Sequence, residues 1–272
     1  MIRFESVSYS YPGHLGAVSA LRDVTLQIDE RELVAVLGAN GSGKSTLALL
    51  ANGLLGPSSG LVDVDGIDTR DEARAFDIRA QVGLVLQNPD NQIVATTVEE
   101  DVAFGPENLG MPRDEIRARV DRAIAAVGLE GLERREPHLL SGGQKQRLAI
   151  AGVLALDPLY LILDEPASML DAAGRREFDA VLGRLRAQGR GIVLITHDLA
   201  AVAGADRVVV LAEGAVAFDG DLGELLRHPG RLSEWGLSLP PVGVLAEELR
   251  SRGVPIPLDA ITPLSVAEAL WR

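Results

Sequence analysis

The segment from Gly38 to Ser45 has the residue types and spacing of a phosphate-binding loop. Glycines permit backbone conformations in which successive N–H groups converge on phosphate oxygens at the positive end of the following helix. We expect Lys44 to neutralise the outer phosphates and the Ser45 hydroxyl to bind magnesium. The pattern G-x-x-x-x-G-K-[ST] is matched, with Thr46 following, by Gly38, Ala39, Asn40, Gly41, Ser42, Gly43, Lys44 and Ser45. The sequence therefore predicts a nucleoside triphosphate site.

Several further segments narrow the class of nucleotide enzyme. In chain order they are Gln87 after Val82–Leu86, Leu140-Ser141-Gly142-Gly143-Gln144, Asp164-Glu165 after Leu159–Leu163, Ser168-Met169-Leu170-Asp171, and His197 after Ile192–Thr196. Together with the phosphate-binding loop, these motifs resemble those of ATP-binding cassette ATPases, over roughly residues 1–230. The resemblance implies ATP and Mg²⁺ as ligands.

The resemblance implies a role for each polar group of the site. Asp164 is expected to hold the magnesium, largely through water, while Glu165 polarises the attacking water. His197 would contact the terminal phosphate and orient that water, although a lone histidine is more often a solvated surface group. Gln87 would touch the metal and the water from a loop that moves. Lys44 completes the expected catalytic set.

Two further features imply a site shared between two chains. Tyr11 stands where the family places a ring that stacks on adenine, with Phe4 and Tyr9 as nearby competitors for that role. In the family, Ser141, Gly142, Gly143 and Gln144 begin a helix that closes on ATP held by the opposite subunit, and Asp171 lies in the crossing contact. The expected partner is a second ATPase subunit, identical or paralogous.

Strand and helix patterns predict a mixed α/β core that positions these residues. Apolar runs without alternation predict buried strands, and Ile2–Val7 with Leu21–Ile28 predicts an antiparallel pair. The expected buried strands are Leu33–Leu37, Val82–Leu86, Leu159–Leu163, Ile192–Thr196 and Val208–Leu211, and the expected helices are Leu47–Leu55, Pro112–Val127, Gly142–Leu156 and Arg175–Gln188. The resemblance implies a P-loop NTPase cassette with a RecA-like core, an antiparallel β subdomain, a helical subdomain inserted at about 88–157, and a helical C-terminal extension.

Composition favours a cytoplasmic protein that binds neither lipid nor nucleic acid broadly. The 272 residues include no cysteine, and 26 basic against 39 acidic residues give a formal charge of −13. Such a charge opposes contact with nucleic acid or anionic lipid. No apolar run approaches the roughly 18 residues of a membrane helix, and the N-terminus lacks a targeting pattern. With membrane partners, the expected location is peripheral, at the cytoplasmic face of the cell membrane.

The segment between Gln87 and Asn108 resembles that of a narrower group, the ATPases of energy-coupling factor importers. That resemblance implies uptake of a vitamin or a cobalt or nickel ion, through a membrane coupling protein and a substrate-binding membrane protein. The acidic cluster there is expected to face the coupling protein, the alternative being a solvated acidic helix. It comprises Glu99, Glu100, Asp101 and Glu107. The SMLD segment favours the first ATPase type, although Ala172 follows where proline is usual.

Beyond the cassette, residues 231–272 have the pattern of a helical extension. Val242, Leu245, Ala246 and Leu249 form an apolar stripe, and Ser265 with Glu268 predicts a capping box for a last short helix. We expect the extension to join two ATPase chains, the alternative being an appendage packed on its own domain. Other functions stay open: the ATPase of a different transporter, or a soluble non-transport cassette ATPase.

Overall fold

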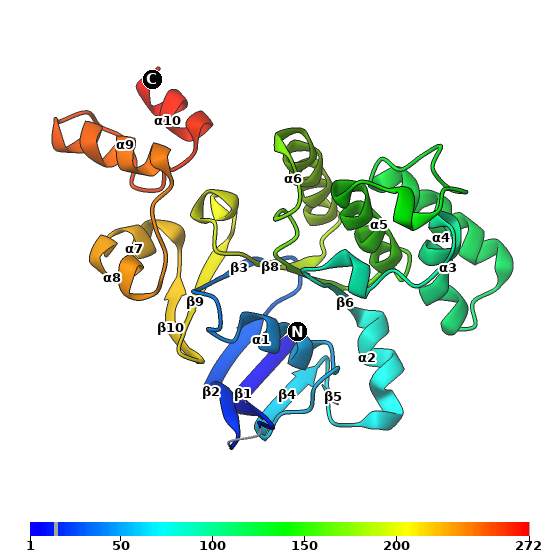
Figure 1. The fold of residues 1–272 in the computed structure, drawn as a ribbon. Coiled ribbons are helices and arrows are strands. Elements are labelled where there is room, and N and C mark those ends of the chain that lie inside the picture. The colour runs from blue at the N-terminus through cyan, green and yellow to red at the C-terminus, as the bar shows by residue number, and fades with distance from the viewer. Residues whose placement is uncertain (14–15, 272) are drawn as a thin grey trace.

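The computed structural model describes residues 1–13 and 16–271 and shows two sheets, a group of helices on one side and a terminal helical unit (Figure 1). The larger sheet has six strands in the order β10-β9-β3-β8-β7-β6, parallel except for the antiparallel edge strand β10. These strands are β3 (Leu33–Leu37), β6 (Val82–Val85), β7 (Tyr160–Asp164), β8 (Gly191–Ile195), β9 (Arg207–Ala212) and β10 (Ala215–Gly220). The five predicted buried strands are confirmed to within one residue at each end.

The order of this sheet brings the polar loops together. The carboxyl ends of parallel strands lie at one edge, and ligands of open α/β sheets bind at that edge. The phosphate-binding loop follows β3, Gln87 follows β6, Glu165 follows β7 and His197 follows β8. Four segments distant in sequence therefore meet beside α1 (Lys44–Ala51).

The smaller sheet is antiparallel and packs against the other side of α1. Its order is β2-β1-β4-β5, and Leu47 and Leu50 of α1 share one buried cluster with Phe4 and Val34, which come from the two sheets. The strands are β1 (Ile2–Tyr11), β2 (Val18–Ile28), β4 (Ser59–Val64) and β5 (Ile67–Asp68). The β1–β2 pair was predicted, and β1 extends far enough to carry Tyr11 to the phosphate-binding loop.

Between β6 and β7 the described elements are all helical, and they form the group at one side of the cassette in Figure 1. On α4, which lies within the helix predicted at Pro112–Val127, Val120 and Ile124 are buried. The elements are η2 (Pro89–Asn91), α3 (Val98–Asn108), α4 (Arg113–Ala126), η3 (Pro137–Leu139) and α5 (Gly142–Leu154).

Three of the four acids in the cluster of α3 have partners within the chain. Asp101 is 7% exposed, and its Oδ1 accepts hydrogen bonds from the N–H groups of Val94 and Ala95. Glu100 closes a capping box with Thr97, and Glu99 pairs with Arg117 at 3.1 Å. Carboxylates favour a helix N-terminus because they satisfy its free N–H groups. Glu100 thus caps the start of α3, Asp101 holds the loop before it and Glu99 bridges to α4, whereas Glu107 is exposed without such a contact.

The remaining helices flank the sheets. α6 follows the SMLD segment, whereas α7 and α8 continue from β10. They are η1 (Glu72–Arg74), α2 (Ala75–Gln81), α6 (Ala172–Ala187), η4 (Leu199–Val202), α7 (Leu222–Leu226) and α8 (Pro229–Glu234). Among the described helices, none is both long enough and apolar enough to span a membrane.

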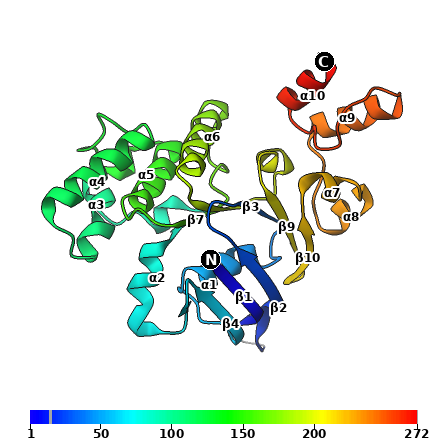
Figure 2. The same cartoon turned by 180° about the vertical axis from the view of Figure 1, so that it is seen from behind.

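The C-terminal helices α9 (Pro241–Ser251) and α10 (Pro263–Leu270) lie beyond α7 and α8, as the view from behind shows (Figure 2). Ala246 belongs to a small separate core against which Val242 and Leu249 pack. The predicted stripe is thus largely covered by the extension itself, while Leu245 points outward, 52% exposed.

The predicted capping box of the last helix is wrong in register. Thr262, not Ser265, caps α10, and Ser265 fills the third helical position. The helix can begin three residues earlier because Pro263 suits the first helical position, where no N–H bond is required.

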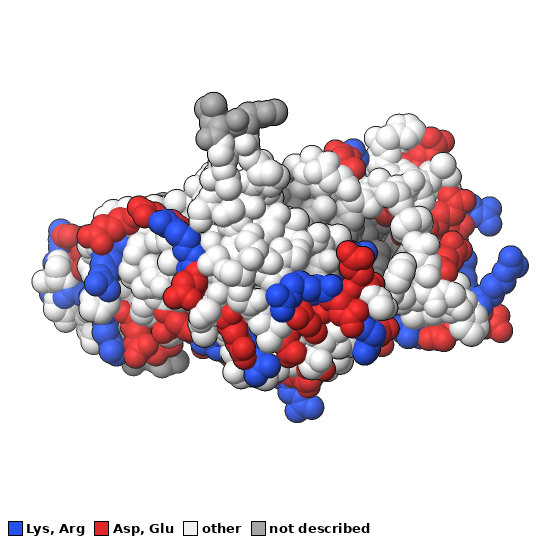
Figure 3. All heavy atoms as spheres, turned by 90° about the horizontal axis from the view of Figure 1, so that it is seen from below, with Lys and Arg blue, Asp and Glu red and all other residues white. Residues whose placement is uncertain are grey.

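The charged surface agrees with the composition. On the face seen from below, acidic and basic side chains are interspersed rather than gathered into a basic patch (Figure 3). That arrangement gives a nucleic acid backbone no continuous positive surface on this face.

Candidate active site

The phosphate-binding loop has a backbone shape that only glycine fits at two positions. Gly38 has φ +149°, and a Cβ placed there would lie 2.2 Å from the carbonyl oxygen of Leu211. Gly43 has φ +104°, and its Cβ would lie 2.6 Å from the carbonyl oxygen of Ala20. Both residues let the loop pass close against neighbouring strands while it turns into α1.

Two polar side chains of this loop suit an anion. Ser42 is 4% exposed, and its buried Oγ has no hydrogen-bond partner among the described residues. Lys44 is 7% exposed, and its Nζ donates to the carbonyl oxygens of Gly38 at 2.8 Å and Ala39 at 2.9 Å. Burial lowers the pKa of Lys44, while the nearby Glu165 and Asp164 carboxylates act in the opposite direction. A phosphate would supply the hydroxyl with an acceptor and the ammonium with a counter-charge, so the loop fits the group.

Three oxygen-bearing side chains meet beside Lys44. Burial raises the pKa of Asp164, against a hydrogen bond from Ser45 that lowers it, and neighbouring Glu165 raises it further. Gln87 lies in an exposed bend that lines the same cavity. Within the described residues, no cluster of three or more His, Cys, Asp or Glu side chains could hold a metal alone. Hydroxyl, carboxylate and amide oxygens suit Mg²⁺, which keeps waters and phosphate oxygens as its other ligands.

The raised pKa of Asp164 predicts a conflict between stability and function. The fold disfavours the ionised form of Asp164. The contribution of Asp164 to the free energy of unfolding is therefore present at low pH and is lost as the pH rises through the raised pKa. Asp164→Asn should therefore raise Tm by about 2 °C or more at pH 7–8, the shift expected for roughly 1 kcal/mol, and the gain should shrink in acid. Thermal scans over pH, paired with ATPase assays, measure both effects.

Asp179→Asn is the control, because partial desolvation also raises the pKa of Asp179, although this residue is far more exposed than Asp164. It should change stability in the same direction without loss of ATP hydrolysis. A fall in Tm for Asp164→Asn at neutral pH would contradict the stated cause of its raised pKa.

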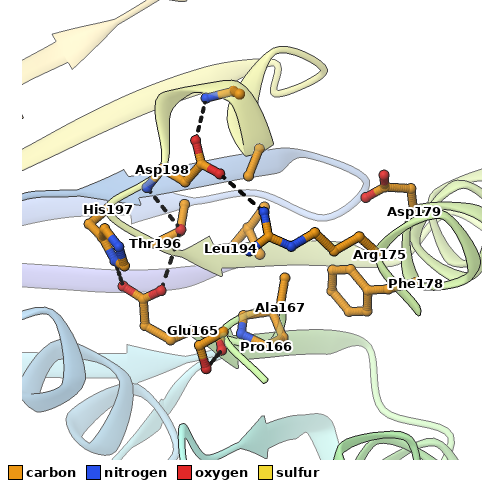
Figure 4. A pocket seen from close by; sticks show the side chains of 13 residues that line it. Glu165, Pro166, Ala167, Arg175, Phe178, Asp179, Leu194, Thr196, His197 and Asp198 are labelled. Carbon is orange, nitrogen blue, oxygen red and sulfur yellow. Dashed lines mark hydrogen bonds and ion pairs between the residues drawn. The ribbon is translucent and has the colours of Figure 1, made fainter. Parts of the chain in front are cut away.

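Glu165 is held in a constrained position at the end of β7. Its φ is +48°, its side chain is buried, and its N–H donates to the carbonyl oxygen of Ile195 at 2.9 Å. Oε1 lies 2.7 Å from Nδ1 of His197, and Oε2 lies 3.5 Å from the Thr196 hydroxyl. In Figure 4, Thr196 and His197, which follow β8, lie on either side of the carboxylate. Six other non-glycine residues of the described chain also have positive φ, so it is burial and the contacts with Thr196 and His197 that set Glu165 apart.

The cavity at this edge brings most of the predicted site residues together. Its volume is about 450 Å³. Tyr11 lines it and its hydroxyl lies 3.2 Å from Oγ1 of Thr46, whereas Phe4 is fully buried in the core. Tyr9 packs edge-on against Tyr11. The predicted residues on the lining are Tyr11, Asn40, Gly41, Gly43, Lys44, Ser45, Thr46, Gln87, Asp164 and Glu165.

A second group of predicted residues lies around a different hollow, of about 370 Å³. Ser141, Gly142, Gly143 and Asp171 line it, and none of them lines the first cavity. Ser141 and Gln144 form the capping box of α5, so the Gln144 side chain is used within its own chain. The two groups of predicted site residues therefore line two separate hollows of one chain.

Some lining residues escaped sequence reasoning. Val18, Ser19 and Ala20 of β2 line the first cavity, but a strand start of small residues carries no chemical signal. Figure 4 also shows Arg175 of α6 reaching Asp198, with the two charged groups 3.7 Å apart. Thr196 could have been predicted from the sequence, because it directly precedes His197.

Comparisons with known proteins agree with this geometry. The family model described as ABC transporter matches residues 21–168. The energy-coupling factor transporter ATP-binding protein EcfA1 of Symbiobacterium thermophilum is 53% identical over 98% of this chain and 95% of its own length. The EcfA1 protein of Caldanaerobacter subterraneus is 47% identical over 100% of this chain and 99% of its own length.

Solved structures are similar as well. The cbiO1 protein of Clostridium perfringens, part of the ABC transporter complex cbiONQ, has a TM-score of 0.75 and 39% identity over 90% of this chain and 98% of that one. A dimeric post-hydrolysis state of the ATP-binding cassette MJ0796, bound to ADP and Pi, has a TM-score of 0.76 and 31% identity. The match covers 82% of this chain and 99% of that one.

Proposed function

The chain belongs to the ABC transporter family and, within it, to the ATP-binding proteins of energy-coupling factor transporters, and we propose that it hydrolyses ATP in sites built from two cassettes. One observation carries the chemistry. The phosphate-binding loop, Asp164 and Glu165 line a single cavity, and His197 contacts Glu165 at its edge.

Each residue then has a defined task in binding. Tyr11 stacks on the adenine ring, while the loop from Gly38 to Thr46 receives the phosphates through its N–H groups, the Ser42 hydroxyl and Lys44. Ser45, Asp164 and Gln87 would hold Mg²⁺, with Asp164 acting largely through water, and the metal would neutralise charge on the phosphate oxygens.

The hydrolytic step needs a positioned water. Glu165 accepts a proton from that water as it attacks the terminal phosphate, and the contact between Oε1 and His197 fixes the direction of the carboxylate. His197 is 64% exposed at its side chain and so is free to reach the terminal phosphate as well. Gln87 contributes from its exposed loop.

The separate position of the second group supports a composite site. A helix N-terminus with free N–H groups binds anions, and Ser141, Gly142 and Gly143 line a hollow of their own rather than this chain's phosphate cavity. These residues and Gln144 close on the ATP of a second ATPase subunit, identical or paralogous, with Asp171 in the crossing contact. The dimeric state of the similar MJ0796 cassette supports this arrangement.

We further propose a division of the chain at about residue 230. Residues 1–230 form the cassette, with the helical subdomain at about 88–157, and residues 231–272 form an extension that joins two ATPase chains. The exposed Leu245, Leu264 and Trp271 of the extension give such a contact an apolar surface. The extension's own core, however, is built without a partner.

Partners in the membrane follow from the family and from exposed apolar groups near Gln87. Val94 is 61% exposed and Phe104 is 49% exposed, whereas the acids around them are largely engaged within the chain. We propose that these two apolar side chains contact the membrane coupling protein at the cytoplasmic face. A separate substrate-binding membrane protein then selects the solute, a vitamin or a cobalt or nickel ion.

Phe104→Asp tests the coupling role. A charge placed in an apolar contact should lower capture of the coupling protein and solute uptake about tenfold or more, while ATP binding is kept. Co-purification from membranes and uptake into proteoliposomes are the measurements.

Leu159→Asp provides the control, since Leu159 has nearly the same exposure, 48%, at the opposite end of β7 from Glu165. It should leave capture intact. Undiminished capture and uptake with Phe104→Asp would overturn the contact, and a parent chain that finds no membrane partner would favour a soluble ATPase.

A further inference from the structure

Gln146 on α5 is buried without hydrogen-bond partners. The residue is 0% exposed, and within the described residues neither Oε1 nor Nε2 of its side chain has a partner. Buried amides are nearly always paired, because leaving one unpaired forfeits its bonds to water. The unpaired amide therefore raises the free energy of this side-chain arrangement.

Contacts on both sides place Gln146 beside the start of the Gln87 loop. Near the end of α5, Cγ1 of Val153 would lie 2.3 Å from a Cβ at Gly83 of β6. Near its beginning, Nζ of Lys145 lies 2.7 Å from Oδ1 of Asp90 in η2. Helix α5 thus runs antiparallel to β6 and the loop that follows it.

The spacing along this helix locates the amide more closely. Gln146 and Val153 are seven residues apart and so share one face of α5, about 10 Å from each other along the axis. That length corresponds to about three strand residues. Counting from Gly83, Gln146 lies level with Leu86 and Gln87.

The loop at that level has polar groups to offer. Among the described residues, Gln87 makes no hydrogen bond through its backbone or its side chain. Gln92 holds the loop from within, accepting from the N–H of Leu86 at 3.1 Å and donating to the carbonyl oxygen of Leu84 at 3.0 Å. Neither bond involves the carbonyl oxygen of Leu86 or the N–H of Gln87, which together form the peptide group between these two residues.

We propose that Gln146 is a positioning residue for Gln87. Its amide hydrogen-bonds to the peptide groups of Leu86 and Gln87 when the loop adopts its catalytic arrangement, and this bond directs the Gln87 side chain toward the phosphate cavity. The unpaired amide raises the free energy of the present arrangement, which favours the shift once nucleotide is bound. The inference rests on the proposed hydrolytic function.

Gln146→Met separates this role from a purely structural one. Methionine keeps the volume and flexibility of glutamine without its polar atoms, so Tm should stay unchanged or rise. The kcat for ATP hydrolysis should fall about tenfold, the effect of losing one hydrogen bond in the active arrangement, with KM and ATP affinity little changed. Hydrogen exchange should show ATP-dependent protection of residues 86–92 in the parent chain and its loss in the variant.

Gln188→Met, at an exposed position following α6, is the control and should change neither kcat nor exchange. Unchanged kcat and unchanged loop protection in Gln146→Met would overturn the inference, and a lowered Tm with normal kcat would show that a trapped water pairs with the amide. A parent chain without ATPase activity, in the assembled complex, would instead contradict the hydrolytic function itself.

Discussion

Glu165→Gln is expected to lower ATP turnover by about two orders of magnitude or more while ATP binding is retained. A positioned general base contributes a factor of this size, and the amide keeps the shape of the side chain but cannot take the proton. Its position depends on the Ile195 carbonyl and on His197, both of which the variant leaves in place. Steady-state hydrolysis by the assembled complex and an equilibrium ATP titration separate the two effects.

Glu30→Gln controls for the loss of one negative charge, since Glu30 lies exposed in the turn between β2 and β3. It should hydrolyse ATP at the parent rate. Turnover of Glu165→Gln near that of the parent chain would remove Glu165 from the mechanism.

Elements with a uniform environment could be predicted from the sequence. Leu33–Leu37 and the first four residues of Ile192–Thr196 are apolar because both faces of a parallel strand are covered. β4 and β10 were not predicted: β4 includes Gly60 and Asp63, and β10 has only partly buried side chains apart from exposed Asp219. Their pairing with β1 and β9, rather than their own pattern, makes them strands.

Site residues were predictable where the motif itself dictates backbone shape. Gly38 and Gly43 occupy conformations that bulkier residues resist, so the loop's geometry is encoded locally. The acids of α3 show the opposite case. Their sequence pattern alone suggests a row of solvated carboxylates. The structure shows that Asp101 and Glu100 accept hydrogen bonds from N–H groups of the preceding turn.

Gln146 shows why burial of a polar residue is hard to predict. It stands in the polar run Gln144-Lys145-Gln146-Arg147 near the start of α5, whose residue types predict exposure to solvent. Its burial arises from the packing of α5 against both β6 and α3, two elements far away in the chain. Local pattern carries no record of that packing.

Lys44→Met is expected to weaken ATP binding by about tenfold to a hundredfold, the loss of one or two charge-assisted contacts. The ammonium is buried among Gly38, Ala39 and the carboxylates of Asp164 and Glu165. Without it, the phosphates would enter a cavity whose nearest charges are negative, so affinity should fall before any effect on the chemical step. Methionine preserves the apolar part of the side chain and avoids a cavity beside α1.

Lys145→Met is a matched control for binding, because Lys145 is the only other lysine of the chain and pairs with Asp90 outside the phosphate-binding loop. Equilibrium titration at several salt concentrations should show parent-like affinity for Lys145→Met and a weaker, less salt-dependent affinity for Lys44→Met, since part of the attraction is electrostatic. Equal ATP affinity in Lys44→Met and the parent chain would mean that the loop N–H groups and Ser42 bind the phosphates alone, and Lys44 would then lose its assigned role.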